Sequence, residues 1–363
     1  MKKSNWIKKI YLDKGAENEP LSRRILDKLP GIPVELLEDI EKIKLELRLN
    51  PDPVAESKKI ILLTKQKSFL RPCPCSPGAI SCGYWTIDLD LNCPLDCSYC
   101  ILQSYFDHQP MTISINRESL KSELDTFFEN KKNRILRVGT GELGDSLALD
   151  NLTENSIFLA GLFRGKENFF LELKTKTDNI EQLLKIKALP NVIIAWSLNT
   201  ERIIETEEKG TANLENRLRA ALQVINHGYR VAFHFDPIIY YQGWEQEYQE
   251  IIKKLFKLIP LEKIAWISLG TLRFPAAFVK ILRRRFPNNE IYSQEFIKSW
   301  EGKYRYPRPL RTRIYLEMKR MIAEFKAENQ IYLCMESALV WRDFLAENKR
   351  GKLTSAFPFP WLS

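Results

Sequence analysis

The central part of the chain alternates between short apolar runs and longer segments in which apolar residues recur every three or four positions. The runs are rich in β-branched and aromatic residues, as buried strands are, whereas the spacing of the longer segments is typical of amphipathic helices. One such helix is expected over residues 215–225, closed by Gly228 before the next strand. The predicted strands cover residues 84–91, 135–138, 169–174, 192–197, 230–235 and 264–269.

Strand–helix alternation at intervals of ~30–40 residues predicts parallel strands with crossover helices. Six such units form an α/β fold of the partial (β/α)6 barrel type, predicted for residues 84–275. Residues 1–83 are expected to form an N-terminal α/β element, with a helix over 34–47 and a strand over 60–64. Residues 276–363 are expected to form a C-terminal extension with a helix near 312–329.

The segment between residues 93 and 100, the cysteine loop, follows the first predicted strand and has the spacing C-x3-C-x2-C. Three thiolates on one short loop can ligate three irons of a [4Fe–4S] cluster and leave the fourth iron open. A zinc knuckle and a disulfide pair are the alternatives. The spacing fits a four-ligand zinc site poorly, and an odd total of seven cysteines argues against a disulfide framework. The predicted cluster ligands are Cys93, Cys97 and Cys100.

Four cysteines lie outside this loop, and four is the number that completes an all-cysteine metal site. Three of them fall in a Pro- and Gly-rich stretch, and the fourth is far along the chain. An auxiliary iron–sulfur cluster, a structural zinc and unligated thiols are all compatible with this pattern. These residues are Cys73, Cys75, Cys82 and Cys334.

Positive charge is concentrated in residues 271–320, which hold thirteen Lys and Arg against four Asp and Glu and so account for the net charge of +9. Such a local excess favours a polyanionic partner, and interleaved aromatic residues add stacking surfaces for bases. The alternative is a solvated basic helix face with core aromatics. The candidate nucleic-acid contacts are Tyr304, Arg305, Arg308 and Arg311.

No stretch approaches the ~20 consecutive apolar residues that span a bilayer, and no apolar segment follows the basic N-terminus. We therefore expect a cytoplasmic protein without a membrane partner, in a compartment where thiols stay reduced.

The cysteine loop, with Tyr99 before its last cysteine, resembles the radical S-adenosylmethionine (SAM) superfamily. That resemblance implies SAM bound at the open iron, an external reductant such as flavodoxin or ferredoxin, and cleavage to a 5′-deoxyadenosyl radical. Residues 138–142 look like the superfamily's glycine–glycine–glutamate element. Small residues there let backbone approach a ligand, and a carboxylate can bind its ammonium group. The residues implied to position SAM are Tyr99, Gly141, Glu142, Lys176, Ser197, Asn199 and Asp236, with Tyr99 and Glu142 as the catalytic candidates.

Residues 93–103, 147–153, 195–199 and 237–245, with Lys176, are similar to spore photoproduct lyase and its relatives, over roughly residues 85–310. This resemblance implies radical repair of a DNA photolesion. The chain departs from that family where a cysteine after the second strand is replaced by Glu142, and where Ile101 replaces a tyrosine.

The departures leave other functions open. One alternative is radical modification of RNA, a peptide or a small metabolite. Another is a non-catalytic nucleic-acid-binding protein with a structural cluster. Cleavage of SAM separates the enzymes from the binding protein.

Overall fold

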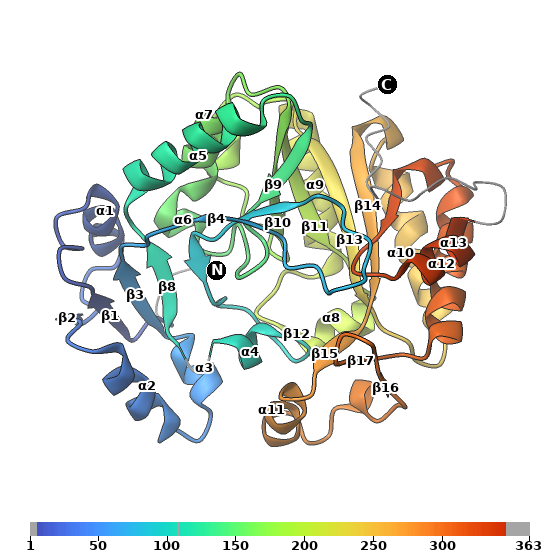
Figure 1. Ribbon diagram of the computed structural model, residues 1–363, viewed down its shortest axis with the longest axis horizontal. Coiled ribbons are helices and arrows are strands. Elements are labelled where there is room, and N and C mark those ends of the chain that lie inside the picture. Colours follow the sequence, from blue (N-terminus) through green and yellow to red (C-terminus); the bar gives the residue numbers. More distant parts are fainter. Residues whose placement is uncertain (1–5, 107–108, 346–363) are drawn as a thin grey trace.

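The computed structural model describes residues 6–106 and 109–345. Its largest sheet has eight strands in the order β18-β14-β13-β11-β10-β9-β5-β4, and it curls into an open half-barrel with helices outside (Figure 1). All neighbouring strands are parallel except β4 and β5. The strands are β4 (Leu70–Pro72), β5 (Trp85–Ile87), β9 (Leu136–Gly139), β10 (Phe169–Thr175), β11 (Val192–Ser197), β13 (Arg230–Ile238), β14 (Ile264–Thr271) and β18 (Ile331–Leu333).

The six predicted strands are all present, as β5, β9, β10, β11, β13 and β14, and the partial-barrel prediction is confirmed. Two further strands extend the sheet at its edges. Strand β4 comes from the N-terminal segment and β18 from the C-terminal extension. Each has only three residues, too few to show a hydrophobic period in the sequence.

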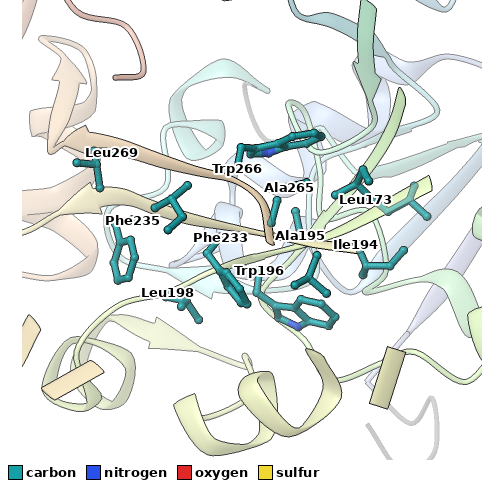
Figure 2. Close-up of a cluster of buried hydrophobic side chains, with 14 of the residues drawn as sticks. Leu173, Ile194, Ala195, Trp196, Leu198, Phe233, Phe235, Ala265, Trp266 and Leu269 are labelled. Atoms are coloured by element: carbon teal, nitrogen blue, oxygen red, sulfur yellow. The ribbon is translucent and has the colours of Figure 1, made fainter. Parts of the chain in front are cut away.

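The central strands of the half-barrel are buried on both faces. Every residue of β11 and β14 is buried, because helices cover the outside and side chains fill the inside. Figure 2 shows part of this core, in which Trp196, Phe233 and Trp266 are fully buried beside smaller aliphatic side chains. The packed core holds the strand ends in fixed positions, which a site built on them requires.

The crossover helices end where capping residues predict. Helix α9 (Leu214–His227) starts at Asn213, whose side chain accepts a hydrogen bond from the Asn216 N–H, and stops at Gly228, where φ is 112°. Only glycine adopts that backbone without strain. The other helices around the half-barrel are α5 (Arg117–Lys131), α6 (Asp150–Thr153), α7 (Asn155–Phe163), α8 (Glu201–Glu207) and α10 (Trp244–Leu258).

A second sheet of five strands has the order β2-β1-β3-β8-β6. Strand β3 (Ile60–Thr64) confirms the predicted strand, but the predicted helix over 34–47 is wrong in its first part. Residues Val34–Leu36 form β2, which pairs with β1 (Lys9–Leu12), because sheet pairing overrides the helical spacing there. The remaining elements are α1 (Pro20–Lys28), α2 (Ile40–Arg48), α3 (Pro53–Ser57), β6 (Asp90–Leu91) and β8 (Met111–Ser114).

The two sheets exchange strands across the predicted chain divisions. Strands β6 and β8 lie in the segment predicted as barrel but join the N-terminal sheet, while β4 and β18 join the half-barrel from outside that segment. The division at residues 83/84 and 275/276 therefore stays a prediction about folding units, and the hydrogen-bonded sheets do not follow it.

The C-terminal extension packs back onto the half-barrel. Its strands β17 (Lys303–Arg305) and β16 (Ile297–Lys298) form a three-stranded sheet with β15 (Arg273–Pro275), which directly precedes the extension. Helices α11 (Phe278–Arg285), α12 (Arg308–Ala323) and α13 (Ala338–Leu345) complete it, and α12 confirms the predicted helix with an earlier start. Within the described ranges, no helix combines the length and apolar character that crossing a membrane requires.

Candidate active site

A cavity of about 490 Å³ opens at the carboxyl ends of the half-barrel strands. Its wall combines the cysteine loop, the loop after β9, the ends of β10, β11 and β13, and part of β17. Barrels of this class carry their chemistry at this face. The predicted site residues that line the cavity are Cys93, Cys97, Tyr99, Cys100, Gly141, Glu142, Lys176, Ser197 and Asp236.

Backbone pairing fixes the cysteine loop beneath the cavity. Strand β7 (Asp96–Cys97) pairs antiparallel with β12 (Glu208–Lys209). The N–H of Ser98 donates to the carbonyl of Glu207 at 2.8 Å. The side-chain amide of Gln103, on α4 (Leu102–Tyr105), donates to the Cys97 carbonyl at 2.7 Å. The loop therefore keeps its shape through contacts that leave the thiols available.

Arg285 of the extension binds the outer side of the cysteine loop. Its guanidinium forms two hydrogen bonds to Asp96, at 2.8 and 3.1 Å, and two to Asp52 of the N-terminal segment, at 2.8 and 3.0 Å. Lys58 adds an ion pair with Asp96 at 3.2 Å. Planar two-point pairing of this kind fixes orientation as well as charge. Asp96, which lies between Cys93 and Cys97, is thus bound by Lys58 of the N-terminal segment and by Arg285 of the extension.

The three thiols of the loop fit an iron–sulfur cluster better than a single metal ion. Within the described part of the chain, no three His, Cys, Asp or Glu side chains converge on one ion position. Zinc requires every sulfur within ~2.3 Å of one centre, whereas each thiolate of a [4Fe–4S] cluster binds a different iron. Burial, with the nearby Asp145 carboxylate, raises the pKa of Cys93 to about 12. Iron binding at this thiol would therefore displace a proton.

Tyr99 lies within a buried polar group behind the thiols. Its hydroxyl donates to Glu208, which also forms an ion pair with the buried Arg217. Lys176 lies 3.9 Å from Glu208, and its ammonium is 5.8 Å from the centre of the Tyr99 ring. Burial raises the pKa of Tyr99, as does the charge of Glu208. The phenol is thus neutral, and its ring faces the cavity beside the Lys176 ammonium.

The loop after β9 approaches the cavity closely because it carries small residues. A Cβ added to Gly141 would lie 2.9 Å from the Cβ of Lys174, so a larger side chain would force the two strand ends apart. Asp145 holds the loop, accepting hydrogen bonds from the Lys176 N–H and the Thr175 hydroxyl, both at 2.7 Å. This arrangement leaves Glu142 at the cavity wall.

The ends of β11 and β13 complete the wall. Ser197 lines the cavity, whereas Asn199 does not. The Asn199 amide donates to the Pro237 carbonyl at 3.1 Å and accepts from the Tyr248 hydroxyl at 2.6 Å, so it joins the two strand ends. Asp236 is paired with Arg273 through contacts of 2.9 and 3.1 Å. Burial raises the pKa of Asp236, but Arg273 lowers it more, and the carboxylate stays ionised.

Comparisons with known proteins agree with this geometry. The family model described as spore photoproduct lyase matches residues 8–334. This chain belongs to the spore photoproduct lyase family.

Curated relatives share a low identity over most of the chain. The spore photoproduct lyase of a Geobacillus species is 23% identical over 339 residues, covering 89% of this chain and 97% of the relative. That of Bacillus subtilis is 23% identical over 311 residues, covering 82% and 89%.

Solved structures share the fold. One is a spore photoproduct lyase complexed with dinucleoside spore photoproduct, with a TM-score of 0.77 and 19% identity over 92% of this chain and 99% of that one. Another is a mutant with bound AdoMet and the same dinucleoside, with a TM-score of 0.77, 20% identity and the same coverage.

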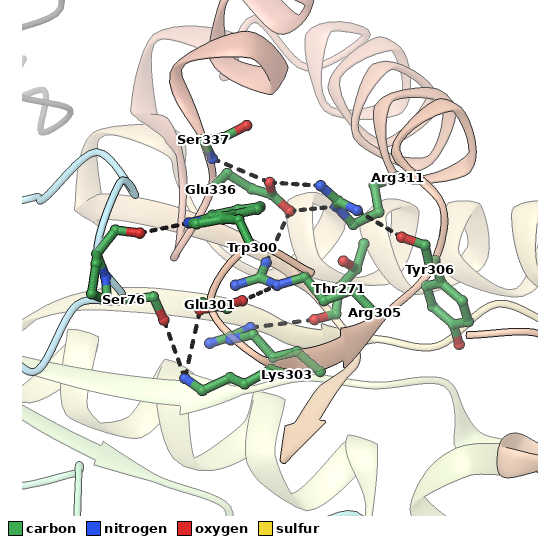
Figure 3. A network of polar contacts seen from close by, with 12 residues as sticks. Ser76, Thr271, Trp300, Glu301, Lys303, Arg305, Tyr306, Arg311, Glu336 and Ser337 are labelled. Carbon is green, nitrogen blue, oxygen red and sulfur yellow. Dashed lines mark hydrogen bonds and ion pairs between the residues drawn. The ribbon is translucent and has the colours of Figure 1, made fainter. Parts of the chain in front are cut away.

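Two of the predicted nucleic-acid contacts are buried in this family member. Arg305 and Arg311 are 1% and 3% exposed, and both form ion pairs with the fully buried Glu336, as Figure 3 shows. This corrects the expectation of an exposed basic face at these positions, which charge density in the sequence could not distinguish from internal pairing. Arg308 is exposed, and Tyr304 stacks on Phe274 with ring centres 5.7 Å apart.

Several charged or flexible lining residues were not predicted as site residues. Asp145 carried a usable signal, because it follows the small residues of the β9 loop, and Lys174 stands at the end of a predicted strand. The others enter the cavity only through the fold. They include Arg273, Lys303 and Met335.

The four additional cysteines of this lyase family member lie beside the cavity and do not line it. Cys73, Cys75 and Cys82 are on the loop between β4 and β5, and Cys334 directly follows β18. None of the seven cysteines forms a disulfide.

Proposed function

We propose that this protein is a radical SAM enzyme that acts on a pyrimidine photolesion in DNA. The observation that carries the proposal is the convergence on one cavity of three cysteine thiols, a carboxylate and an ammonium group. A [4Fe–4S] cluster bound by Cys93, Cys97 and Cys100 would supply the electron that cleaves SAM. The bound AdoMet and dinucleoside photoproduct of the solved relative support the same pairing of ligands here.

The lining residues match the charges of the amino-acid end of SAM. Glu142 would accept hydrogen bonds from the ammonium group, and Lys176 would pair with the carboxylate. Because Glu208 lies 3.9 Å from Lys176, the ammonium of Lys176 is held near the cavity before SAM arrives. Ser197 would donate to the ribose or carboxylate. Asn199 would act by positioning, since it ties the ends of β11 and β13 together.

Tyr99 and Asp236 would shape the two sides of the nucleoside site. Tyr99 presents a neutral ring fixed by Glu208, which suits stacking or edge contact with adenine. Asp236 is held by Arg273, so the pair presents a nearly neutral polar surface to the ligand.

The hydrogen-return route differs from that of relatives with a cysteine after the second strand. Here that loop carries Glu142 and the residue after the last cluster cysteine is Ile101. A carboxyl group does not replace a thiol as a donor of hydrogen atoms, so we propose that this chain lacks the usual relay. Product formed in D2O should then carry no deuterium at the reacting carbon. Deuterium at that carbon would show that an exchangeable group, a thiol or a tyrosine hydroxyl, still donates, and would contradict the absence of a relay.

The cavity mouth offers contacts for a nucleic acid. Lys303 lines the cavity, Tyr105 lines it with 49% of its surface exposed, and Arg308 is exposed at the start of α12. Cations of this kind neutralise phosphates, and an exposed ring stacks on a base turned out of the helix. We further propose that electrons come from flavodoxin or ferredoxin in the cytoplasm, where the thiols stay reduced.

Anaerobic reconstitution with iron and sulfide, followed by reduction and addition of SAM, tests the first step. We expect 5′-deoxyadenosine from the wild-type protein and none from Cys97→Ala. Dinucleoside spore photoproduct deuterated at the carbon attacked should transfer label to 5′-deoxyadenosine, while undamaged dithymidine should not. An iron-loaded, reduced protein that leaves SAM intact would contradict the radical mechanism. Cleavage of SAM without transfer of label would contradict the proposal that the spore photoproduct is the substrate.

A further inference from the structure

The two edges of the half-barrel sheet are joined by a loop that carries cysteines. The loop between β4 and β5 runs across to the chain that follows β18 (Figure 1). Ala79 and Ser337 form a β-bridge, and the N–H of Ile80 donates to the carbonyl of Glu336 at 2.8 Å. We call residues 73–84 together with residues 334–337 the edge closure. Curling of the sheet thus brings together segments from its opposite edges.

Side chains of the extension fix the edge closure from outside. The Trp300 indole donates to the Pro77 carbonyl at 2.5 Å, and the Lys303 ammonium donates to the Ser76 hydroxyl at 3.2 Å (Figure 3). Glu336 is fully buried and binds Arg311 at 2.9 Å and the Tyr315 hydroxyl at 3.0 Å. The loop is therefore held in one conformation by contacts that do not use its cysteines.

The four cysteines of the edge closure lie on adjoining segments. The backbone of Cys73 extends the β4–β5 hairpin by donating to the Tyr84 carbonyl, and that of Cys334 continues the main sheet by donating to the Leu269 carbonyl, both at 2.8 Å. The Cys75 N–H donates to the Cys73 carbonyl at 2.7 Å, and the Cys75 sulfur lies 3.9 Å from the hydroxyl of Ser81, next to Cys82. The Arg137 guanidinium lies 4.6 Å from the centre of the Tyr84 ring and 4.8 Å from that of the Tyr332 ring, so the chain after Cys82 and the chain before Cys334 meet at one side chain.

Two guanidinium groups point at the sulfurs of this group. Arg137 donates to the Cys82 sulfur at 3.2 Å, and Arg273 lies 3.8 Å from the Cys334 sulfur. Arg137 is only 3% exposed and its other contacts include the Tyr332 hydroxyl at 2.8 Å. Arg137 also pairs with Glu172 at 3.8 Å, and Arg273 pairs with Asp236 at 2.9 Å. Both guanidinium groups can still donate hydrogen bonds to sulfur, and the cysteine sulfurs of iron–sulfur clusters accept such bonds.

We propose that Cys73, Cys75, Cys82 and Cys334 bind a second [4Fe–4S] cluster. A single zinc ion needs all its sulfur ligands within ~2.3 Å of one centre, and among the described residues no three ligand side chains are arranged to hold one ion. A cluster takes each thiolate at a separate iron, so its four ligands need not converge on one point. Four cysteines leave no open iron, so this centre would not bind SAM. The proposal stands independently of the substrate.

The second cluster would sit against the cavity wall. Pro74, between two of the cysteines, and Met335, next to Cys334, both line the cavity. A cluster bound there would link the two edge strands of the half-barrel, β4 and β18, and would make the adjoining wall of the cavity more rigid. Its ligands come from both edges of the sheet, so iron binding would also stabilise the closure itself.

Iron content after anaerobic reconstitution tests the proposal without any assay of activity. The wild-type protein should bind about eight iron and eight sulfide per chain, and the triple variant Cys93→Ala/Cys97→Ala/Cys100→Ala about four, since each cluster holds four irons. Cys82→Ala/Cys334→Ala should also fall to about four and should still cleave SAM. A variant lacking all seven cysteines controls for adventitious iron and should bind none.

Spectroscopy of the wild-type protein covers the case in which a variant fails to fold. After reduction, addition of SAM should change the electron paramagnetic resonance signal of one cluster and leave a second signal unchanged. About four iron in the wild-type protein, with a signal that responds to SAM completely, would overturn the proposal. One zinc per chain in the triple variant would also overturn it. Neither result bears on SAM cleavage, so failure here is distinct from failure of the proposed reaction.

Discussion

The cysteine loop and the edge closure differ in how far apart in sequence their cysteines lie. The cysteine loop has three cysteines within eight residues, although strand β12 and Arg285, which fix it, are distant in sequence. In the edge closure, the segments that carry Cys73 and Cys334 come together because the sheet curls and a β-bridge joins them. A local site can be found from spacing alone. A site closed by the fold depends on contacts that lie far from it in sequence, so the two should respond differently to mutation.

The largest effect should come from Glu336→Gln, which removes the negative charge at the centre of the edge closure. Arg311 would lose its ion pair and Arg305 one of its two. Breaking a buried pair from one side costs ~3–5 kcal/mol of the free energy of unfolding. Urea denaturation measures it. If the second cluster depends on the closure, the iron content should also fall while SAM cleavage remains.

Glu317→Gln is the matched control for this change. Glu317 forms an ion pair with Arg320 on the surface of the same helix that carries Arg311. Loss of such a pair should cost ~0–1 kcal/mol. Equal losses of unfolding free energy in the two variants would show that the buried ion pairs of Glu336 stabilise the protein no more than a surface pair does.

Arg285→Ala should have the next largest effect, and it should act on the cysteine loop. The Arg285 side chain is 5% exposed and pairs with both Asp96 and Asp52. A lost hydrogen bond to a charged group costs ~1.5–3 kcal/mol, and because the carboxylates of Asp52 and Asp96 remain partly open to water, we expect a total loss of this order. We expect lower stability and loss of the SAM-responsive cluster signal, with the second signal kept. Arg283→Ala, at an exposed position of the same helix, should change neither.

The sequence predicts the parts of this molecule that rest on local pattern. Six parallel strands follow from apolar runs, and the proposal that three cysteines ligate a cluster follows from their spacing. The sequence could not reveal that Arg305 and Arg311 are buried. An arginine carries the same charge whether it binds a phosphate group at the surface or, as here, Glu336 in the interior. Strands β4 and β18 escaped notice because three-residue strands have no period. The burial of Arg305 and Arg311 and the pairing of β18 with β14 both depend on segments that are not neighbours in sequence.

Glu142→Gln should have a smaller effect, and it tests whether the carboxylate at the cavity wall binds SAM. The change keeps size and one acceptor but removes the charge that would bind an ammonium group. A charge-assisted hydrogen bond contributes ~1.5–3 kcal/mol, which corresponds to a ~10–100-fold weaker affinity for SAM. Calorimetric titration of the iron-loaded protein measures it. Glu205→Gln, at an exposed position on α8, should bind SAM normally. Normal affinity in both would remove Glu142 from the SAM site.

The smallest effect should come from Arg308→Ala, which tests whether α12 faces nucleic acid at its exposed start while Arg311 serves the edge closure inside. One lost phosphate contact reduces the slope of log binding constant against log salt by ~0.9 for duplex DNA. It should weaken binding of damaged and undamaged DNA alike, because phosphates carry no base identity. Arg320→Ala, an exposed arginine in the last turn of the same helix, should leave the slope unchanged. The same slope in both variants would place the DNA elsewhere on the rim, and would leave Lys303 and Tyr105 as the residues to change next.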